Sequence, residues 1–293
     1  MNEKKLSALA VAVLAIGATP AAGEILHVEK SLYRNIVVYE DNGVRCMRFS
    51  RNATTRQTCI SLTDDRYLVF NYMRTMMGAL YVNPSPSRIL IVGLGGGAIA
   101  GALQKMLPAA KIDAVEIDPA VVRVARTYFG FVPTQQTDIY EEDGRVFAKR
   151  MLKQGVKYDL VILDAFDHQY IPEHLLTREF LLEVRGLLNP RGVVTTNTYA
   201  STRLYDHESA TYHSVFGNFY SLVTNNRVII ATVAGLPDTD ELRRNAEAVE
   251  ARLRAVGTGK DALLPLFKVE SGWPASTRIL TDQYSPSNLL NGT

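Results

Sequence analysis

Carboxylates that could do chemistry stand in this chain directly after short apolar runs. Glu116 follows the run at residues 112–115, and both Asp164 and Asp167 follow the run at residues 160–163. A carboxylate at the end of a buried strand is costly unless it binds a cationic group or acts as a base. Asp164 and Asp167 are therefore candidate catalytic residues, and a solvated loop without function is the alternative.

A glycine cluster precedes these acids, after the apolar run at residues 89–92. Its members are Gly93, Gly95, Gly96 and Gly97. Glycines there permit positive φ angles and a close approach to a ligand, while a following helix offers unpaired N–H groups. A tight turn without a ligand would give the same pattern. Glu116 favours the ligand, because a carboxylate about 20 residues beyond such a loop can accept both hydroxyls of a ribose.

Two further acids stand before helical stretches. Asp143 and Gly144 form a helix cap in the simplest interpretation, but in a nucleoside-binding domain Asp143 could also accept the exocyclic amine of adenine. Asp118 is followed by Pro119, the usual pairing of a cap with a proline at the first helical position. We therefore expect Asp118 to be structural.

The elements that position these residues follow from the apolar pattern. Continuous apolar runs alternate with helical stretches, which is typical of buried strands in a parallel, doubly wound α/β sheet. The expected strands are residues 89–92, 112–115, 160–163, 193–196 and 228–231, and the expected flanking helices are residues 64–80 and 239–256. Together with the glycine loop, Glu116 and the acids after residue 163, the pattern predicts a Rossmann-like fold of the S-adenosylmethionine-dependent methyltransferase type.

The N-terminal quarter has a different character. Residues 1–23 combine a basic start, a short apolar core and small residues, which is the form of a secretory signal peptide; an uncleaved membrane anchor is the alternative. We then expect an antiparallel β module at residues 24–63, the Rossmann-like domain at 64–260 and a tail at 261–293. Cys46 and Cys59 would face each other across a hairpin of the module. Their disulfide would fit an oxidising compartment, periplasmic or extracellular, and two free thiols are the alternative.

Composition limits the partners. The 32 basic and 30 acidic residues are spread along the chain and give a formal charge of +2, without a basic stripe of the kind that binds phosphate backbones. We therefore expect no nucleic-acid partner. We also expect no metal ion.

Several of these features together resemble the spermidine synthase (polyamine aminopropyltransferase) family, and more closely its spermidine-synthase-like branch. The resemblance runs from about residue 31 to residue 199. The matching features are Ser31-Leu-Tyr33-Arg-Asn-Ile36, the helix carrying Tyr72, the glycine loop, Val115-Glu116-Ile117-Asp118, Asp143-Gly144, and the pair Asp164 and Asp167.

The resemblance implies an activity and roles for these residues. In that family an aminopropyl group moves from decarboxylated S-adenosylmethionine to a diamine, and methylthioadenosine leaves. Glu116 would bind the ribose, Asp143 the adenine, and Asp164 would take a proton from the attacking amine. Asp167 and Tyr72 would orient that amine. The partner would be a small-molecule amine, and the β module and the exposed face of the helix at residues 64–80 are possible homodimer surfaces.

The chain departs from the family at the ends of both substrates. Gly96 stands where the family has an aspartate that holds the amino end of the donor, so intact S-adenosylmethionine is an alternative co-substrate. Met73 and Arg74 replace a glutamine and a glutamate, and His168 replaces the proline that usually follows Asp167. The acceptor therefore stays open.

Other side chains could contribute to the amine site. His168 could be a second base or a substrate contact, although a loop histidine is more often exposed and inactive. Tyr199, Tyr205 and Tyr212 could line an amine pocket, although packing explains them equally well.

We predict a spermidine-synthase-like transferase that acts on an S-adenosyl sulfonium donor and an amine acceptor. The first alternative is a methyltransferase that uses intact S-adenosylmethionine, which Gly96 favours. The second is an exported protein that binds the nucleoside or the polyamine without turnover, which the signal peptide favours.

Overall fold

The computed structural model describes residues 23–51, 53–166 and 171–292. Residues 1–22 of the expected signal peptide therefore lie outside the described residues, as do Asp167 and His168. Within the described ranges, no helix is long and apolar enough to cross a membrane.

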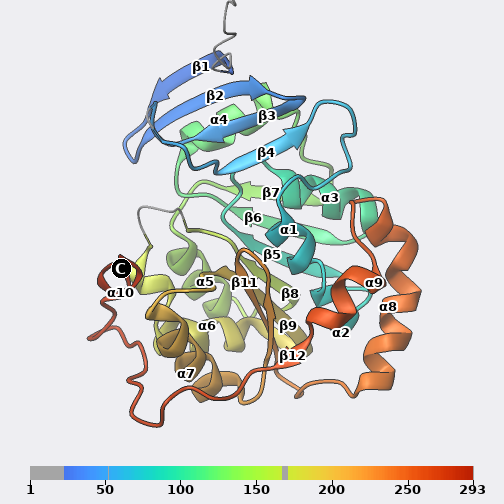
Figure 1. Cartoon of the computed structure of the whole chain (residues 1–293), viewed down its shortest axis with the longest axis vertical. Helices are drawn as coiled ribbons and strands as arrows, with labels where there is room; N and C mark the ends of the chain where they lie inside the picture. Colours follow the sequence, from blue (N-terminus) through green and yellow to red (C-terminus); the bar gives the residue numbers. More distant parts are fainter. Residues whose placement is uncertain (1–22, 52, 167–170, 293) are drawn as a thin grey trace, which may run out of the picture.

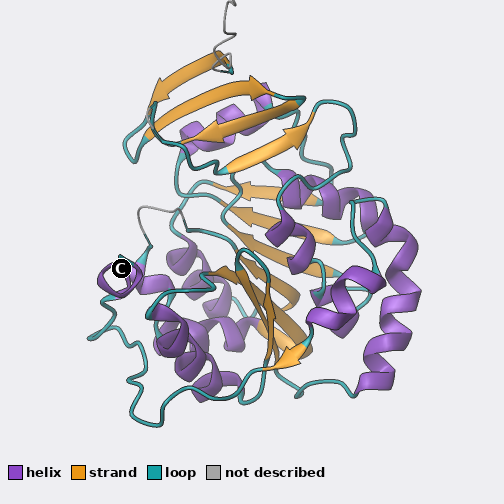
Figure 2. Ribbon diagram, in the orientation of Figure 1, coloured by secondary structure: helices purple, strands orange, loops and turns teal. Residues whose placement is uncertain are grey.

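Eight strands of the described chain form one central sheet, in the order β12-β10-β11-β9-β8-β5-β6-β7 (Figures 1 and 2). The strands are β5 (Arg88–Val92), β6 (Lys111–Val115), β7 (Thr137–Tyr140), β8 (Tyr158–Leu163), β9 (Leu188–Thr198), β10 (Tyr220–Val223), β11 (Arg227–Thr232) and β12 (Lys268–Val269). Strands β5 to β9 are parallel to one another, while β10, β11 and β12 pair antiparallel. The order reverses between β5 and β8, where ligands bind in such sheets.

Helices cover both faces of this sheet and bury the continuous apolar strands that the sequence indicates. One face carries α1 (Asn71–Met76), α2 (Ala79–Val82), α3 (Ala98–Met106) and α8 (Thr239–Arg254). The other carries α5 (Gly144–Lys153), α6 (Arg178–Leu187) and α7 (Leu204–Phe216). The doubly wound Rossmann-like fold is confirmed. Four short elements also belong to this part of the described chain, and they are η1 (Glu173–Leu175), α9 (Lys260–Leu263), η2 (Leu264–Leu266) and α10 (Ser287–Asn291).

The expected helix at residues 64–80 is wrong in its first half. Helix begins only at Asn71, because Leu68 forms a bridge with Ile60 and its N–H donates to the Val256 carbonyl, 3.2 Å away. Residues 64–70 therefore form a turn and an isolated bridge instead of helix, and of their apolar side chains Leu68 is buried while Tyr67 is exposed.

The β module is a four-stranded antiparallel sheet of β1 (Glu24–Lys30), β2 (Asn35–Asp41), β3 (Val44–Arg48) and β4 (Thr58–Ser61). It lies at the top of Figure 1, and α4 (Pro119–Tyr128) packs against it. Asn42 and Gly43 turn the β2–β3 hairpin with positive φ angles of 48° and 77°, as a type I′ turn requires.

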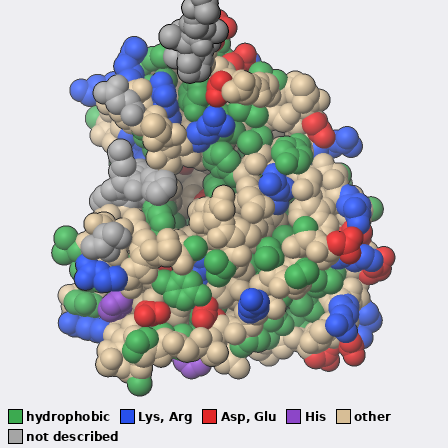
Figure 3. Space-filling model, in the orientation of Figure 1, with side chains coloured by type: hydrophobic (Ala, Val, Ile, Leu, Met, Phe, Trp, Pro, Cys, Tyr) green, Lys and Arg blue, Asp and Glu red, His purple; other side chains and the backbone are tan. Residues whose placement is uncertain are grey.

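The cysteines occupy facing positions in the β3–β4 pair, and Cys46 and Cys59 form a disulfide buried in the module. The predicted pairing is confirmed. On the face shown in Figure 3, basic and acidic side chains are interspersed, and the surface is hollowed below the β module.

Candidate active site

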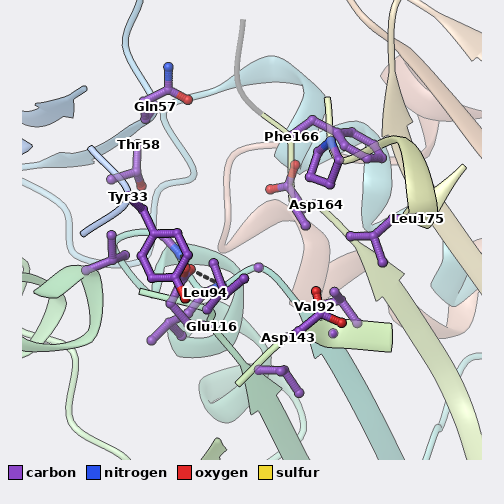
Figure 4. A pocket seen from close by; sticks show the side chains of 18 of the residues that line it. Tyr33, Gln57, Thr58, Val92, Leu94, Glu116, Asp143, Asp164, Phe166 and Leu175 are labelled. Atoms are coloured by element: carbon purple, nitrogen blue, oxygen red, sulfur yellow. Dashed lines mark hydrogen bonds between the residues drawn. The ribbon is translucent and has the colours of Figure 1, made fainter. Parts of the chain in front are cut away.

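A cavity of about 270 Å³ lies between the β module and the carboxyl ends of the parallel strands (Figure 4). The sheet contributes the ends of β5, β6 and β8 and the residues after β7. The module contributes Tyr33, Arg34, Phe49, Gln57 and Thr58. Of the residues predicted from sequence, Gly93, Gly95, Glu116, Asp143, Gly144, Asp164 and Tyr72 line this cavity. The topology thus brings together residues that are up to 92 positions apart.

The four glycines of the loop form two pairs with different surroundings. Gly93 and Gly95 have positive φ angles of 97° and 53° and line the cavity. A Cβ on Gly93 would lie 2.2 Å from the carbonyl oxygen of Asp164, so only glycine fits. Gly96 and Gly97 do not line this cavity but pack against neighbouring side chains, which are Thr58 and Phe129 for Gly96 and Phe131 for Gly97. The predicted contact of Gly96 and Gly97 with the ligand therefore stays a prediction.

Glu116 points into the cavity from the end of β6 and holds the glycine loop (Figure 4). One carboxylate oxygen accepts the N–H groups of Leu94 at 3.1 Å and Gly95 at 3.3 Å, and the other accepts that of Asp118 at 3.2 Å. Burial raises the pKa of Glu116, and these three N–H groups oppose the rise. A carboxylate has about four lone-pair sites, so acceptor capacity is left for a ribose hydroxyl.

Asp143 and Asp118 both cap helices. Asp118 accepts the N–H of Ala120 at 3.0 Å, which confirms its structural role. Asp143 accepts the N–H groups of Arg145 and Val146, both at 2.9 Å, while its second oxygen lies 2.9 Å from Nε2 of His174. The His174 contact holds the pKa of Asp143 below its usual value. Asp143 is therefore an ionised acceptor at the cavity wall, and its binding of adenine stays a prediction.

Asp164 lies at the end of β8 with a donor on each oxygen. The hydroxyl of Tyr72 donates to Oδ2 at 3.2 Å, and Nδ2 of Asn197 donates to Oδ1 at 3.1 Å. Asn197 in turn accepts from Nδ2 of Asn226 at 3.0 Å. Burial raises the pKa of Asp164 to about 6, and the donors from Asn197 and Tyr72 limit the rise. A carboxyl group with this pKa is ionised near neutral pH and basic enough to accept a proton.

A second cavity, of about 640 Å³, adjoins the first. Gln57, Tyr72 and Phe166 line both cavities, so the two meet beside Asp164. Many of the side chains around the second cavity carry amides, and they are Gln57, Asn71, Asn197, Asn225, Asn226, Asn288 and Asn291. The first cavity is therefore the candidate nucleoside site and the second the candidate amine site, and the two share the wall beside Asp164.

The three tyrosines proposed for an amine pocket separate in the structure. Tyr199 lines the second cavity. Tyr205 donates to Glu270, and Tyr212 is a buried core residue whose hydroxyl pairs with Thr196. The amine-pocket hypothesis is therefore wrong for Tyr205 and Tyr212, because their ring faces and hydroxyls are already used in packing.

Sequence reasoning missed four contributors. Asn197 is the next-to-last residue of β9, close to the strand end that Glu116 and Asp164 follow on theirs, so the same logic would have found it. Thr58, His174 and Asn288 come from a module strand, a 3₁₀ turn and the tail, and no local pattern marks them. Metal ligation has no candidate in the described ranges, where no group of three or more histidine, cysteine or acidic side chains is arranged around a common point.

A family model and a curated relative point to the same family. The model of the spermine/spermidine synthase domain matches residues 69–234. A polyamine aminopropyltransferase from Vibrio vulnificus is 44% identical over 272 residues, which cover 91% of each chain.

Solved structures with the same fold come from two kinds of enzyme. A probable spermidine synthase from Corynebacterium glutamicum has a TM-score of 0.69 at 18% identity, over 92% of this chain and 99% of that one. Human methyltransferase-like protein 13, in complex with SAH, has a TM-score of 0.59 at 26% identity, over 71% of this chain and 96% of that one.

Proposed function

This chain belongs to the spermine/spermidine synthase family, and from that premise we propose that it transfers an aminopropyl group from decarboxylated S-adenosylmethionine to a diamine or polyamine. The observation that carries the proposal is the position of Asp164. Its carboxylate lies where the nucleoside cavity meets the second cavity, with Tyr72 forming a wall of both.

The residues suit the steps of this reaction. An amine is protonated near neutral pH, so Asp164 first takes a proton from the acceptor's ammonium group. The free nitrogen lone pair then attacks the propyl carbon bound to the sulfonium. A C–N bond forms, the C–S bond breaks, and its electron pair stays on sulfur as neutral methylthioadenosine leaves. Tyr72 and Asn197 hold the carboxylate in place, so most of their effect is positioning.

At the donor end, Thr58 lies beside Gly96, the position where the family has an aspartate. A Cβ on Gly96 would lie 2.6 Å from Cγ2 of Thr58, so the Thr58 side chain occupies the space that a side chain at position 96 would need. Thr58 lines the nucleoside cavity, and its hydroxyl is buried without a hydrogen-bond partner in the described part of the chain. We propose that it accepts a hydrogen bond from the donor's terminal ammonium group.

Intact S-adenosylmethionine is the second donor to test, beside decarboxylated S-adenosylmethionine. Arg34 lines the same cavity, and its charge acts on Glu116, so a cation is present near the nucleoside. The test incubates the purified protein with putrescine and either donor and identifies the products by mass spectrometry. Methylthioadenosine together with an aminopropyl-extended amine supports the proposal. SAH would indicate methyl transfer instead, and donor binding without any product would overturn an enzymatic role.

We also propose that the protein acts outside the cytoplasm. The signal-like residues 1–23 and the Cys46–Cys59 disulfide support this location. Mass spectrometry of the protein from an expressing bacterium should find a mature N-terminus near Glu24 in the periplasm or medium. A cytoplasmic protein that keeps Met1 would refute the proposal. Homodimer formation stays a prediction, which the mass of the purified protein in solution would test.

A further inference from the structure

The carboxylate of Asp143 has little acceptor capacity left for a ligand. A carboxylate offers about four lone-pair sites. Oδ1 accepts the N–H groups of Arg145 and Val146, and Oδ2 lies 2.9 Å from Nε2 of His174. An ionised carboxylate can only accept, so Nε2 of His174 carries the proton and donates it to this bond. Within the described part of the chain, these three donors leave a single acceptor site, and it is on Oδ2.

His174 is held at this place by its backbone in η1. Its carbonyl accepts from Nη1 of Arg145 at 3.2 Å. The Arg145 side chain is buried, and its guanidinium donates to both carboxylate oxygens of Glu183 and of Asp282 over 2.7–3.0 Å. The N–H of Arg145 is also one of the donors to Asp143. Arg145 thus ties the backbone of His174 to the helix that Asp143 caps, while the His174 ring lines the nucleoside cavity.

Apolar side chains lie beside Asp143 in the same cavity, and they include Val92 and Leu175 (Figure 4). A purine base has apolar faces and a polar edge, so this end of the cavity suits its chemistry. Adenine carries an amine on that edge, and hypoxanthine carries a carbonyl at the same position. The contact with His174 holds the pKa of Asp143 below its usual value, so the carboxylate is ionised. It can accept an N–H of the amine, and it repels the carbonyl oxygen.

We propose that His174 is a positioning residue that determines which purine base the nucleoside cavity binds. Its N–H uses one side of Oδ2 and leaves Asp143 a single acceptor site, which takes one N–H of an exocyclic amine. The ligand class is a 6-aminopurine nucleoside, and the 6-oxopurine nucleoside of the same shape is rejected. This inference rests on the proposed function in one respect, which is that the donor is an adenosyl compound bound in the first cavity.

The test measures the Kd of the purified protein for methylthioadenosine and for methylthioinosine by calorimetry. The wild type should prefer methylthioadenosine roughly ten- to one-hundred-fold, the worth of a hydrogen bond to a charged group. His174→Phe keeps a ring but lacks the N–H, so it should weaken methylthioadenosine about ten-fold and leave methylthioinosine unchanged. His174→Gln retains an N–H donor and should restore most of the preference.

The matched control is His213→Phe. His213 lies in α7, its ring packs against Trp273 with the centroids 5.1 Å apart, and it is outside the walls of both cavities. This variant should keep the wild-type preference between the two nucleosides.

The outcomes separate this inference from the proposed function. A His174→Phe protein with the wild-type preference overturns the inference alone. The same holds if its affinity for both nucleosides falls equally, because that result indicates general disruption of the cavity. A wild type that shows the preference but forms no methylthioadenosine from decarboxylated S-adenosylmethionine and an amine overturns the proposed function alone. A wild type that binds neither nucleoside overturns both.

Discussion

Replacement of Asn197 by alanine should move the acid limb of the pH–rate profile upward. Asn197 donates to Oδ1 of Asp164, which favours the ionised carboxylate and opposes the effect of burial that brings its pKa to about 6. A hydrogen bond to a charged group contributes about 1.5–3 kcal/mol, and one pKa unit corresponds to about 1.36 kcal/mol. Because Asp164 is only partly buried, we take the lower limit, about one unit. The ionised fraction at pH 7 would then fall from roughly 90% to about half.

The assay follows methylthioadenosine formation as kcat/KM between pH 5 and 9, since this quantity reports the pKa values of the free enzyme. Asp164 acts as a base only when it is deprotonated, so the rate falls as the pH drops through its pKa. The control is Asn225→Ala, which also lines the second cavity but makes no contact with Asp164 in the described structure. Its acid limb should stay near that of the wild type. An Asn197→Ala limb that does not move would refute the role given to the amide.

Three further results are expected. Glu116→Gln should weaken the binding of methylthioadenosine about ten-fold, and an unchanged Kd by calorimetry would exclude a ribose contact. Gly96→Asp should destabilise the fold by about 1–3 kcal/mol through overpacking against Thr58, measured as urea unfolding. Addition of Thr58→Gly should restore much of that loss, and a fully stable single variant would contradict the packing argument. Reduction of the Cys46–Cys59 bond, which joins residues 13 positions apart, should cost about 3 kcal/mol; equal denaturation midpoints with and without reductant would show that the bond adds nothing.

Residues governed by local physics could be predicted from the sequence. Buried parallel strands need continuous apolar runs, so β5, β6, β8, β9 and β11 are visible in the sequence. Side chains at their carboxyl ends must meet at one sheet edge, which placed Glu116 and Asp164 in one cavity. The cap at Asp118 and the hairpin pairing of Cys46 with Cys59 are equally local.

What could not be predicted depends on packing between distant segments. Leu68 leaves the helical pattern because it pairs with Ile60. In the sequence, Gly96 indicates only the loss of a donor-binding aspartate. In the structure, Thr58, which stands 38 positions earlier, occupies the space beside Gly96. Asn288 reaches Ile171 across 117 positions, and no spacing in the sequence indicates that contact.

The most direct test of the central claim is the rate of methylthioadenosine formation by Asp164→Asn, compared with wild type under saturating donor and acceptor. A general base contributes roughly 10²–10⁴-fold, so turnover should fall by at least that lower figure while nucleoside binding is retained. The wild-type acid limb near pH 6 should also be absent from the variant. A variant that turns over at the wild-type rate would contradict the assignment of Asp164 as the base at the junction of the two cavities.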